Sequence, residues 1–187
     1  MTVLSTRERE VVAVGAAIGA GCRPCTQYHV RAGLKAGLTA DEVRLAVDEA
    51  EVLRIHAATT IADFARGLLG FSEERAAPLC IPSEPLQALA QVGAATGSNA
   101  GQALDRLLPH ARGVGLSSEA LSEAVEMARV VKRMAGEFFG KDAERALGGE
   151  TKVVSPAGGA SCVEVAQPCA GAPDSREAAV SATTSCC

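Results

Sequence analysis

Apolar side chains recur along most of this chain with the spacing of amphipathic α-helices. In residues 40–69 they return every three, four or seven positions, and the apolar stripe consists of Val43, Val47, Ala50, Ala57, Ile61, Phe64 and Leu68. Such a stripe predicts a helix that packs on a core along that face. No segment alternates convincingly between apolar and polar residues, so the pattern predicts an all-α fold.

Turn and capping signals divide this pattern into six helices. We expect them at residues 5–18, 22–36, 40–69, 84–97, 100–113 and 118–147. Gly19 and Gly21 mark the first turn, and Gly37 supplies the left-handed residue that often ends a helix. Thr39 and Glu42 have the spacing of a capping box, in which each side chain accepts a hydrogen bond from a free backbone N–H.

Two halves of the chain come into register without a gap when the sequence is shifted by 78 positions. From Val11 to Gly70, 15 of 60 paired positions are identical, matched glycines among them. A repeat of this kind predicts two tandem three-helix units, at residues 1–71 and 86–149, joined by a proline-containing linker at 72–85. Residues 150–187 are rich in Ala, Ser, Gly, Pro and Thr, which predicts a flexible, disordered tail.

Composition narrows the class of function. With 18 Lys and Arg against 22 Asp and Glu, the formal net charge is −4, which gives no reason to expect nucleic acid or a membrane as a partner. Aromatic residues make up only 3%, so the core must consist mostly of Ala, Val and Leu. The apolar stretch from Val11 to Cys22 ends as a lipoprotein signal does, but it is too short to span a bilayer. We therefore expect a cytoplasmic protein.

The strongest candidate for chemistry is the pair Cys22 and Cys25, at the point where the Gly19–Gly21 turn gives way to a helix. Their spacing puts both sulfurs on one helical face, where they can close a disulfide. Cys25 would lie in the first turn, where free N–H groups and the helix dipole favour the reactive thiolate. The alternatives are two buried structural thiols, or half of a zinc site completed from His29, Cys80, His56 and Glu10.

Two further residues can handle a proton beside this pair. His29 follows Cys25 by four residues, one helical turn, so its imidazole lies over the same face. Folding the first helix back across the turn places Glu10 level with His29, although Glu8 competes for this role. A carboxylate orients an imidazole that must take a proton from a thiol and return it. Tyr28 is expected to pack between the site and the core, with lining of the pocket mouth as the alternative.

Glu10, Cys22, Cys25 and His29, in the pattern Glu-x11-Cys-x-x-Cys-x3-His, resemble the AhpD-like branch of the carboxymuconolactone decarboxylase family. The resemblance covers about residues 4–70, and residues 82–148 more weakly. It implies an AhpD-like helical fold, usually oligomeric, in which the dithiol reduces hydroperoxides or a partner peroxiredoxin without an organic cofactor. By this resemblance Cys25 attacks, Cys22 resolves the sulfenic acid as a disulfide, and Glu10 with His29 manages the proton. External thiols would restore the dithiol.

The chain departs from this family pattern at Pro24, because peroxidase members commonly carry a histidine between the cysteines. Arg23 and Pro24 are instead similar to the active-site dipeptide of thioredoxin-like proteins, so exchange with partner disulfides is an equal expectation. The second repeat has Ala100, Ala103 and Leu107 at the positions of Cys22, Cys25 and His29, and Ala88 opposite Glu10. We expect no site there.

Two other functions remain open from the sequence. Cys186 and Cys187, at the end of the tail, are good ligands for soft metals and for metalloids such as arsenite, so the protein could be a thiol-based metal-binding protein. The family's other activity, decarboxylation of a ring lactone, needs an acid and a base but no dithiol. Apart from the tail pair we expect no metal site, and we expect a homo-oligomer.

Overall fold

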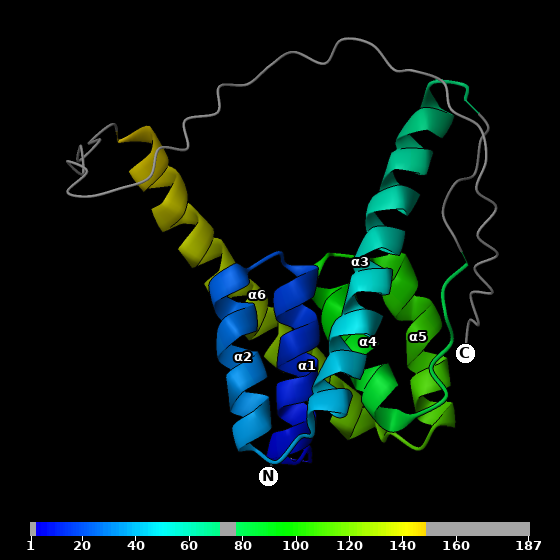
Figure 1. Ribbon diagram of the computed structural model, residues 1–187. Helices are drawn as coiled ribbons and strands as arrows, with labels where there is room; N and C mark the ends of the chain where they lie inside the picture. Colours follow the sequence, from blue (N-terminus) through cyan, green and yellow to red (C-terminus); the bar gives the residue numbers. More distant parts are fainter. Residues whose placement is uncertain (1–2, 72–77, 149–187) are drawn as a thin grey trace, which may run out of the picture.

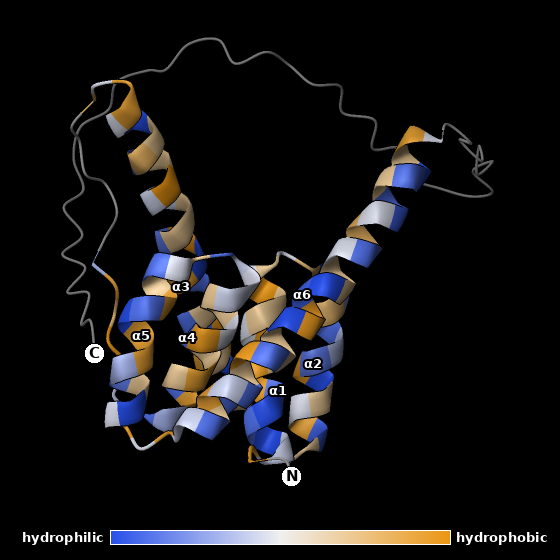
Figure 2. Ribbon diagram, turned by 180° about the vertical axis from the view of Figure 1, so that it is seen from behind, coloured by the Kyte–Doolittle hydropathy of each residue, from blue (hydrophilic) through white to orange (hydrophobic). Residues whose placement is uncertain are grey.

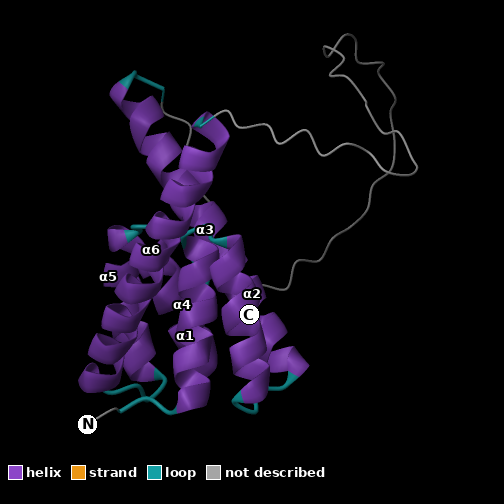
Figure 3. Ribbon diagram, turned by 90° about the vertical axis from the view of Figure 1, so that its left-hand side faces the viewer, coloured by secondary structure: helices purple, strands orange, loops and turns teal. Residues whose placement is uncertain are grey.

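The computed structural model describes residues 3–71 and 78–148. Within these ranges the chain forms helices and turns but no strand: α1 (Thr6–Gly19), α2 (Arg23–Lys35), α3 (Ala40–Leu68), α4 (Pro85–Gly97), α5 (Gly101–Gly113) and α6 (Ser118–Leu147). Figure 3 shows this all-helical arrangement. Every predicted helix is present with its ends within one residue of the expected position, so the predicted all-α fold is confirmed.

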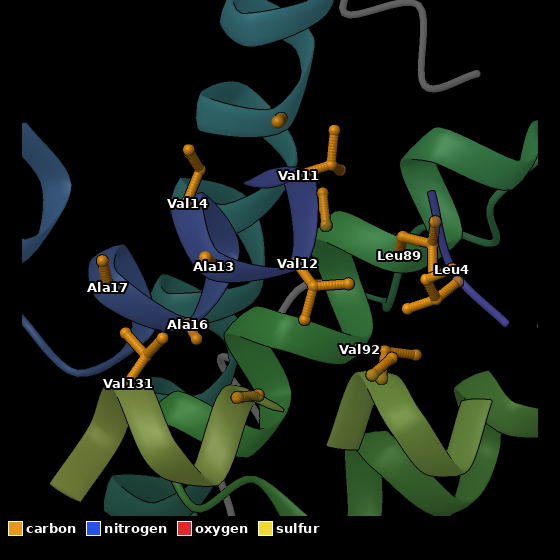
Figure 4. Packing of buried hydrophobic residues seen from close by; sticks show 14 of the residues in the cluster. Leu4, Val11, Val12, Ala13, Val14, Ala16, Ala17, Leu89, Val92 and Val131 are labelled. Carbon is orange, nitrogen blue, oxygen red and sulfur yellow. The ribbon is translucent and has the colours of Figure 1, made fainter. Parts of the chain in front are cut away.

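Helices α1 and α4 lie side by side at the centre of the bundle, and the other four helices pack around them (Figure 1). Residues Val11 to Ala17 of α1 are fully buried on every side of the helix. Val11, Val12 and Val14 point away from α1 in different directions into the surrounding helices (Figure 4). The apolar stretch from Val11 onward is therefore the central helix of the core.

The matched glycines explain how the two central helices approach so closely. A Cβ atom on Gly15 would lie 2.2 Å from the carbonyl oxygen of Ala90, and a Cβ atom on Gly93 would lie 2.2 Å from that of Val12. Gly19 and Gly97 make the equivalent contacts one turn further along, at 2.4 Å each. Gly19 thus serves helix packing inside α1, whereas Gly21 forms the turn itself, with a φ of 70°. Only glycine permits these backbone contacts.

The helices also repeat with the offset of 78 positions. Helix α2 begins at Arg23 and α5 at Gly101; α3 begins at Ala40 and α6 at Ser118. The expected capping box is present at the start of α3, where the Thr39 hydroxyl accepts a hydrogen bond from the Glu42 N–H and the Glu42 carboxylate accepts one from the Thr39 N–H. Gly37 has the expected left-handed conformation, with a φ of 91°.

The C-terminal parts of α3 and α6 extend beyond the rest of the bundle on the same side (Figures 1 and 3), and in the view of Figure 1 they diverge. The prediction that the apolar stripe of α3 packs on the core along its whole length is therefore wrong. Val43, Ala50 and Ala57 are buried, but three later members are exposed, by 68% at Ile61, 64% at Phe64 and 74% at Leu68. No helix of the described residues lies against this part of α3, and Figure 2 shows the apolar residues along both extensions.

Candidate functional site

Cys22 and Cys25 form a disulfide at the start of α2, as the spacing allows. Cys22 is the N-cap residue of α2, and its sulfur accepts a hydrogen bond from the backbone N–H of Cys25 at 3.2 Å. Pro24 lies in the first turn, where its missing N–H leaves no helical acceptor unpaired. Both cysteines are more than nine-tenths buried, so only a small part of the disulfide meets solvent.

The turn between α1 and α2 fixes where this disulfide lies. Gly21 takes a left-handed conformation, and the N–H of Cys22 then donates to the carbonyl of Ala17 at 2.9 Å. One guanidinium nitrogen of Arg54, on α3, donates to the carbonyl of Ile18 at 2.9 Å. The turn reverses the chain, so that α2 runs back along α1 and brings residues far apart in sequence face to face (Figure 1).

Glu10 and His29 meet across the α1–α2 interface. The Nδ1 of His29 lies 2.9 Å from Oε2 of Glu10, and both side chains are less than one-fifth exposed. With Glu10 ionised, Nδ1–H donates to it, which leaves Nε2 to exchange a proton elsewhere. Glu8 does not compete for this place, because its carboxylate caps its own helix through Ser5. The structure therefore joins Glu10 to His29 and Cys22 to Cys25, with His29 four residues after Cys25 on α2.

Tyr28 does not lie where the sequence led us to expect. Its side chain is 66% exposed, so the prediction that it packs between the site and the core is wrong. Its ring instead meets the ring of His29 edge-on, with the centroids 5.0 Å apart and an interplanar angle of 87°. Neighbouring residues of a helix point about 100° apart, so Tyr28 and His29 do not face the same way. The buried face of α2 is formed by Cys25 and Gly33, and Tyr28 lies outside it.

Two pockets meet the surface at Cys22. One, of about 390 Å³, is lined by Cys22, Arg23 and Arg54 among others. The other, of about 530 Å³, lies between the α1–α2 turn, the α4–α5 turn and α6, and Lys132 and Phe138 belong to its wall. Cys22 lines both pockets, whereas Cys25 lines neither. Sequence reasoning missed Arg54 and Lys132, because nothing in the local pattern of α3 or α6 relates them to Cys22.

The second repeat contains apolar residues at the positions of the site. Ala88, Ala103 and Leu107 are buried there, at the positions that correspond to Glu10, Cys25 and His29. Ala100, which corresponds to Cys22, is the N-cap of α5 without a side-chain hydrogen bond. These residues offer no group that exchanges a proton or an electron pair.

Several other expectations concern metals and membranes. Within residues 3–71 and 78–148, no group of three or more His, Cys, Asp or Glu side chains is placed to hold a metal ion. In the same ranges no helix combines the length and the apolar character that crossing a membrane requires. Cys186 and Cys187, and the tail that contains them, lie outside the described residues.

Fold and site together define an all-helical protein with a Cys-x-x-Cys disulfide beside a hydrogen-bonded glutamate and histidine. Residues 2–77 match the model of the carboxymuconolactone decarboxylase family. The matched segment contains all four site residues. No curated protein and no solved structure matches the chain.

Proposed function

We propose that this protein is an AhpD-like thiol oxidoreductase, which uses Cys22 and Cys25 to reduce hydroperoxides or partner disulfides. The observation that supports this most directly is the Cys22–Cys25 disulfide at the start of α2. His29 follows Cys25 by one helical turn, and its imidazole is hydrogen-bonded to Glu10. A disulfide formed by a local pair at a surface pocket is open to exchange, because access and the leaving thiol control the rate. A reducible pair also suits a cytoplasmic protein, which we propose here.

In the reduced protein, we assign the first attack on a hydroperoxide to the Cys25 thiolate. His29 takes the Cys25 proton through one water molecule, and Glu10 holds the imidazole in place. The sulfur attacks the terminal peroxide oxygen, the O–O bond breaks, and the alcohol leaves with a proton. Cys22 then displaces water from the Cys25 sulfenic acid, which forms the disulfide and completes a two-electron reduction. With a partner disulfide, the same dithiol exchanges sulfurs directly.

The test is to reduce the full chain, add a hydroperoxide or a small disulfide, and map the cysteines by mass analysis. We expect a Cys22–Cys25 bridge, and catalytic consumption of peroxide or disulfide when a dithiol reductant is supplied. Cys25→Ser should abolish turnover, while the control Cys80→Ser keeps it. Two free thiols at positions 22 and 25 after both treatments would contradict the proposal.

The family match favours one second candidate, a lyase that decarboxylates a ring lactone. This reaction would use Glu10 and His29 as acid and base and would not need the sulfurs. A variant with both Cys22→Ala and Cys25→Ala separates the two functions. Turnover of a muconolactone by this variant would support the lyase, whereas loss of all activity would support the dithiol enzyme.

We also propose that copies of this chain associate through the extensions of α3 and α6. Large apolar side chains are exposed there, including Ile61, Phe64 and Leu68 on α3 and Phe139 on α6. Such patches on a protein surface commonly mark interaction sites. Analytical ultracentrifugation should show an oligomer that dissociates when Phe64→Asp is introduced, but not when Arg44→Asp is introduced on the same helix. A monomeric wild-type protein would refute the assembly.

A further inference from the structure

Three cationic residues line the two pockets that meet at Cys22. Arg23 and Arg54 line the smaller pocket at Cys22, and Arg23 and Lys132 line the larger one. They come from three helices, α2, α3 and α6, so only the folded chain brings them together. The whole sequence has a net charge of −4, so the positive charge at the pockets beside Cys22 is opposite in sign to that of the chain as a whole.

None of these three cations forms an ion pair with a carboxylate in the part of the chain that the structure describes. Arg54 donates to the carbonyl of Ile18, and Lys132 donates to the carbonyl of Thr96 at 3.3 Å and to Oδ1 of Asn99. These acceptors are all neutral. Among the described residues in the wall of the larger pocket, the one carboxylate is that of Asp142, which already pairs with Arg145 at 3.0 Å.

Arg54 and Lys132 occupy equivalent places in the two repeats, 78 positions apart. Each binds the last turn of a central helix, and the turns themselves correspond, with a φ of 70° at Gly21 and 60° at Asn99. Because Gly21 has no side chain, the guanidinium of Arg54 lies directly against the turn that precedes Cys22. A Cβ atom there would be 2.8 Å from its Nη2. The second repeat thus contributes a cation to a site whose sulfurs belong to the first.

Lys132 is also partly removed from water, and this desolvation lowers its pKa. A cation that has lost water without gaining a carboxylate is stabilised when an anion enters beside it. Lined by such groups, a pocket attracts anions and raises their local concentration near the sulfur.

We propose that the thiol which reduces this disulfide is anionic, carrying a carboxylate or similar group beside its sulfur, and that it attacks Cys22. This inference rests on the proposed thiol oxidoreductase function and names the class of its reductant. The incoming thiolate forms a bond with Cys22 Sγ, the Cys22–Cys25 bond breaks, and Cys25 leaves as a thiolate that takes a proton by way of His29. A second thiol then attacks the mixed disulfide. Two small thiols become one small disulfide, and the protein gains two electrons and two protons.

The test compares three small thiols of different charge on the oxidised full chain: 3-mercaptopropionate, 2-mercaptoethanol and cysteamine. The rate of loss of the Cys22–Cys25 bond is measured at low salt by acid quenching, alkylation and mass analysis of the peptide that contains both cysteines. The ratio of the anionic to the cationic rate in wild type, divided by that in a variant, cancels the intrinsic reactivity of each thiol.

We expect the ratio of the anionic to the cationic rate to be about threefold to tenfold lower in Arg54→Gln and in Lys132→Gln than in wild type, and this difference to disappear at 0.5 M salt. Arg133→Gln, which removes an exposed cation of α6 that is paired with Glu137, is the matched control and should leave the ratio unchanged. Arg54→Lys keeps the charge and should keep most of the preference. The rate with 2-mercaptoethanol, whose attacking thiolate carries one negative charge, should fall less than the rate with 3-mercaptopropionate in Arg54→Gln and Lys132→Gln, and should stay unchanged in Arg133→Gln.

Two results would overturn the inference while leaving the proposed function intact. One is a ratio that is the same in wild type, Arg54→Gln and Lys132→Gln. The other is a trapped mixed disulfide that fragmentation of the peptide locates on Cys25 instead of Cys22. A bond that no thiol reduces, 2-mercaptoethanol included, would instead contradict the proposed function.

Discussion

Replacing Gly15 by alanine tests how the two central helices pack. A Cβ atom at this position would lie 2.2 Å from the carbonyl oxygen of Ala90, about 1 Å closer than carbon and oxygen normally approach. The neighbouring atom belongs to the backbone of α4, so relief requires the helices to move apart. Overpacking of this kind costs about 1–3 kcal/mol.

A matched control isolates this cost. Gly136 lies inside α6, and a Cβ atom there would meet nothing within 4 Å. Gly136→Ala should therefore stabilise the protein by about 0.5–1 kcal/mol through helix propensity alone. At Gly15 the same gain is offset by the clash, so the two variants should differ in free energy of unfolding by the cost of the clash, about 1–3 kcal/mol. For a chain of this length the melting temperatures should then differ by about 2–12 °C.

The assay is thermal unfolding followed by circular dichroism at one protein concentration. Gly93→Ala gives an internal check, because its Cβ atom would meet the carbonyl of Val12 at the same 2.2 Å. The two substitutions should thus destabilise the protein about equally. If Gly15→Ala melts at or above the temperature of Gly136→Ala, the close contact between α1 and α4 is not present in solution and the reasoning fails.

Three further predictions concern the site and its supports. Glu10→Gln should lower kcat by about tenfold to a hundredfold with little change in KM, because His29 loses the carboxylate that orients it; steady-state kinetics with a dithiol reductant measure this, and an unchanged kcat would count against the role. Gly21→Ala should lower the free energy of unfolding in urea more than Gly37→Ala does. Both positions have a positive φ, but only Gly21 also lies against Arg54. Equal losses of unfolding free energy would show that this contact is unimportant. The backbone N–H of Val3, followed by the Arg9 guanidinium, lowers the pKa of Glu123 below 4.5. The Glu123 carboxylate therefore stabilises the fold above pH 4.5, and this stabilisation is lost as the pH falls through the lowered pKa. In urea unfolding from about pH 6 to 3, the midpoint of Glu123→Gln should fall less steeply than that of wild type, and parallel curves would contradict this prediction.

The helices, the Cys22–Cys25 pair and the Glu10–His29 contact could be predicted because their signals are local. Capping residues such as Thr39 fix where a helix begins, and a spacing of four within one helix fixes that His29 lies above Cys25. The position of Glu10 needed one further step, the reversal of the chain at Gly21, and a single turn constrains that strongly.

What could not be predicted depends on contacts between distant elements. Periodicity identifies the apolar face of α3, but it does not say how far the partner helices reach, and so Ile61 and Phe64 are exposed against expectation. The positions of Arg54 and Lys132 beside Cys22 depend on how α3 and α6 cross the ends of α1 and α4. No spacing within either helix encodes this.

Arg54 and Lys132 are equivalent residues of the two repeats, and through Lys132 the second repeat contributes to a pocket beside Cys22 although it has no cysteine pair of its own. A cation at the C-terminal end of a helix interacts favourably with its free carbonyls, which accounts for one cation at each central helix without any reference to chemistry. That capping role predicts a loss of stability on substitution, whatever thiol is used. A preference for anionic thiols is a separate quantity, because a ratio of rates on the same folded protein does not change with its stability. Both roles can therefore belong to the same side chain, and melting and charge preference measure them independently.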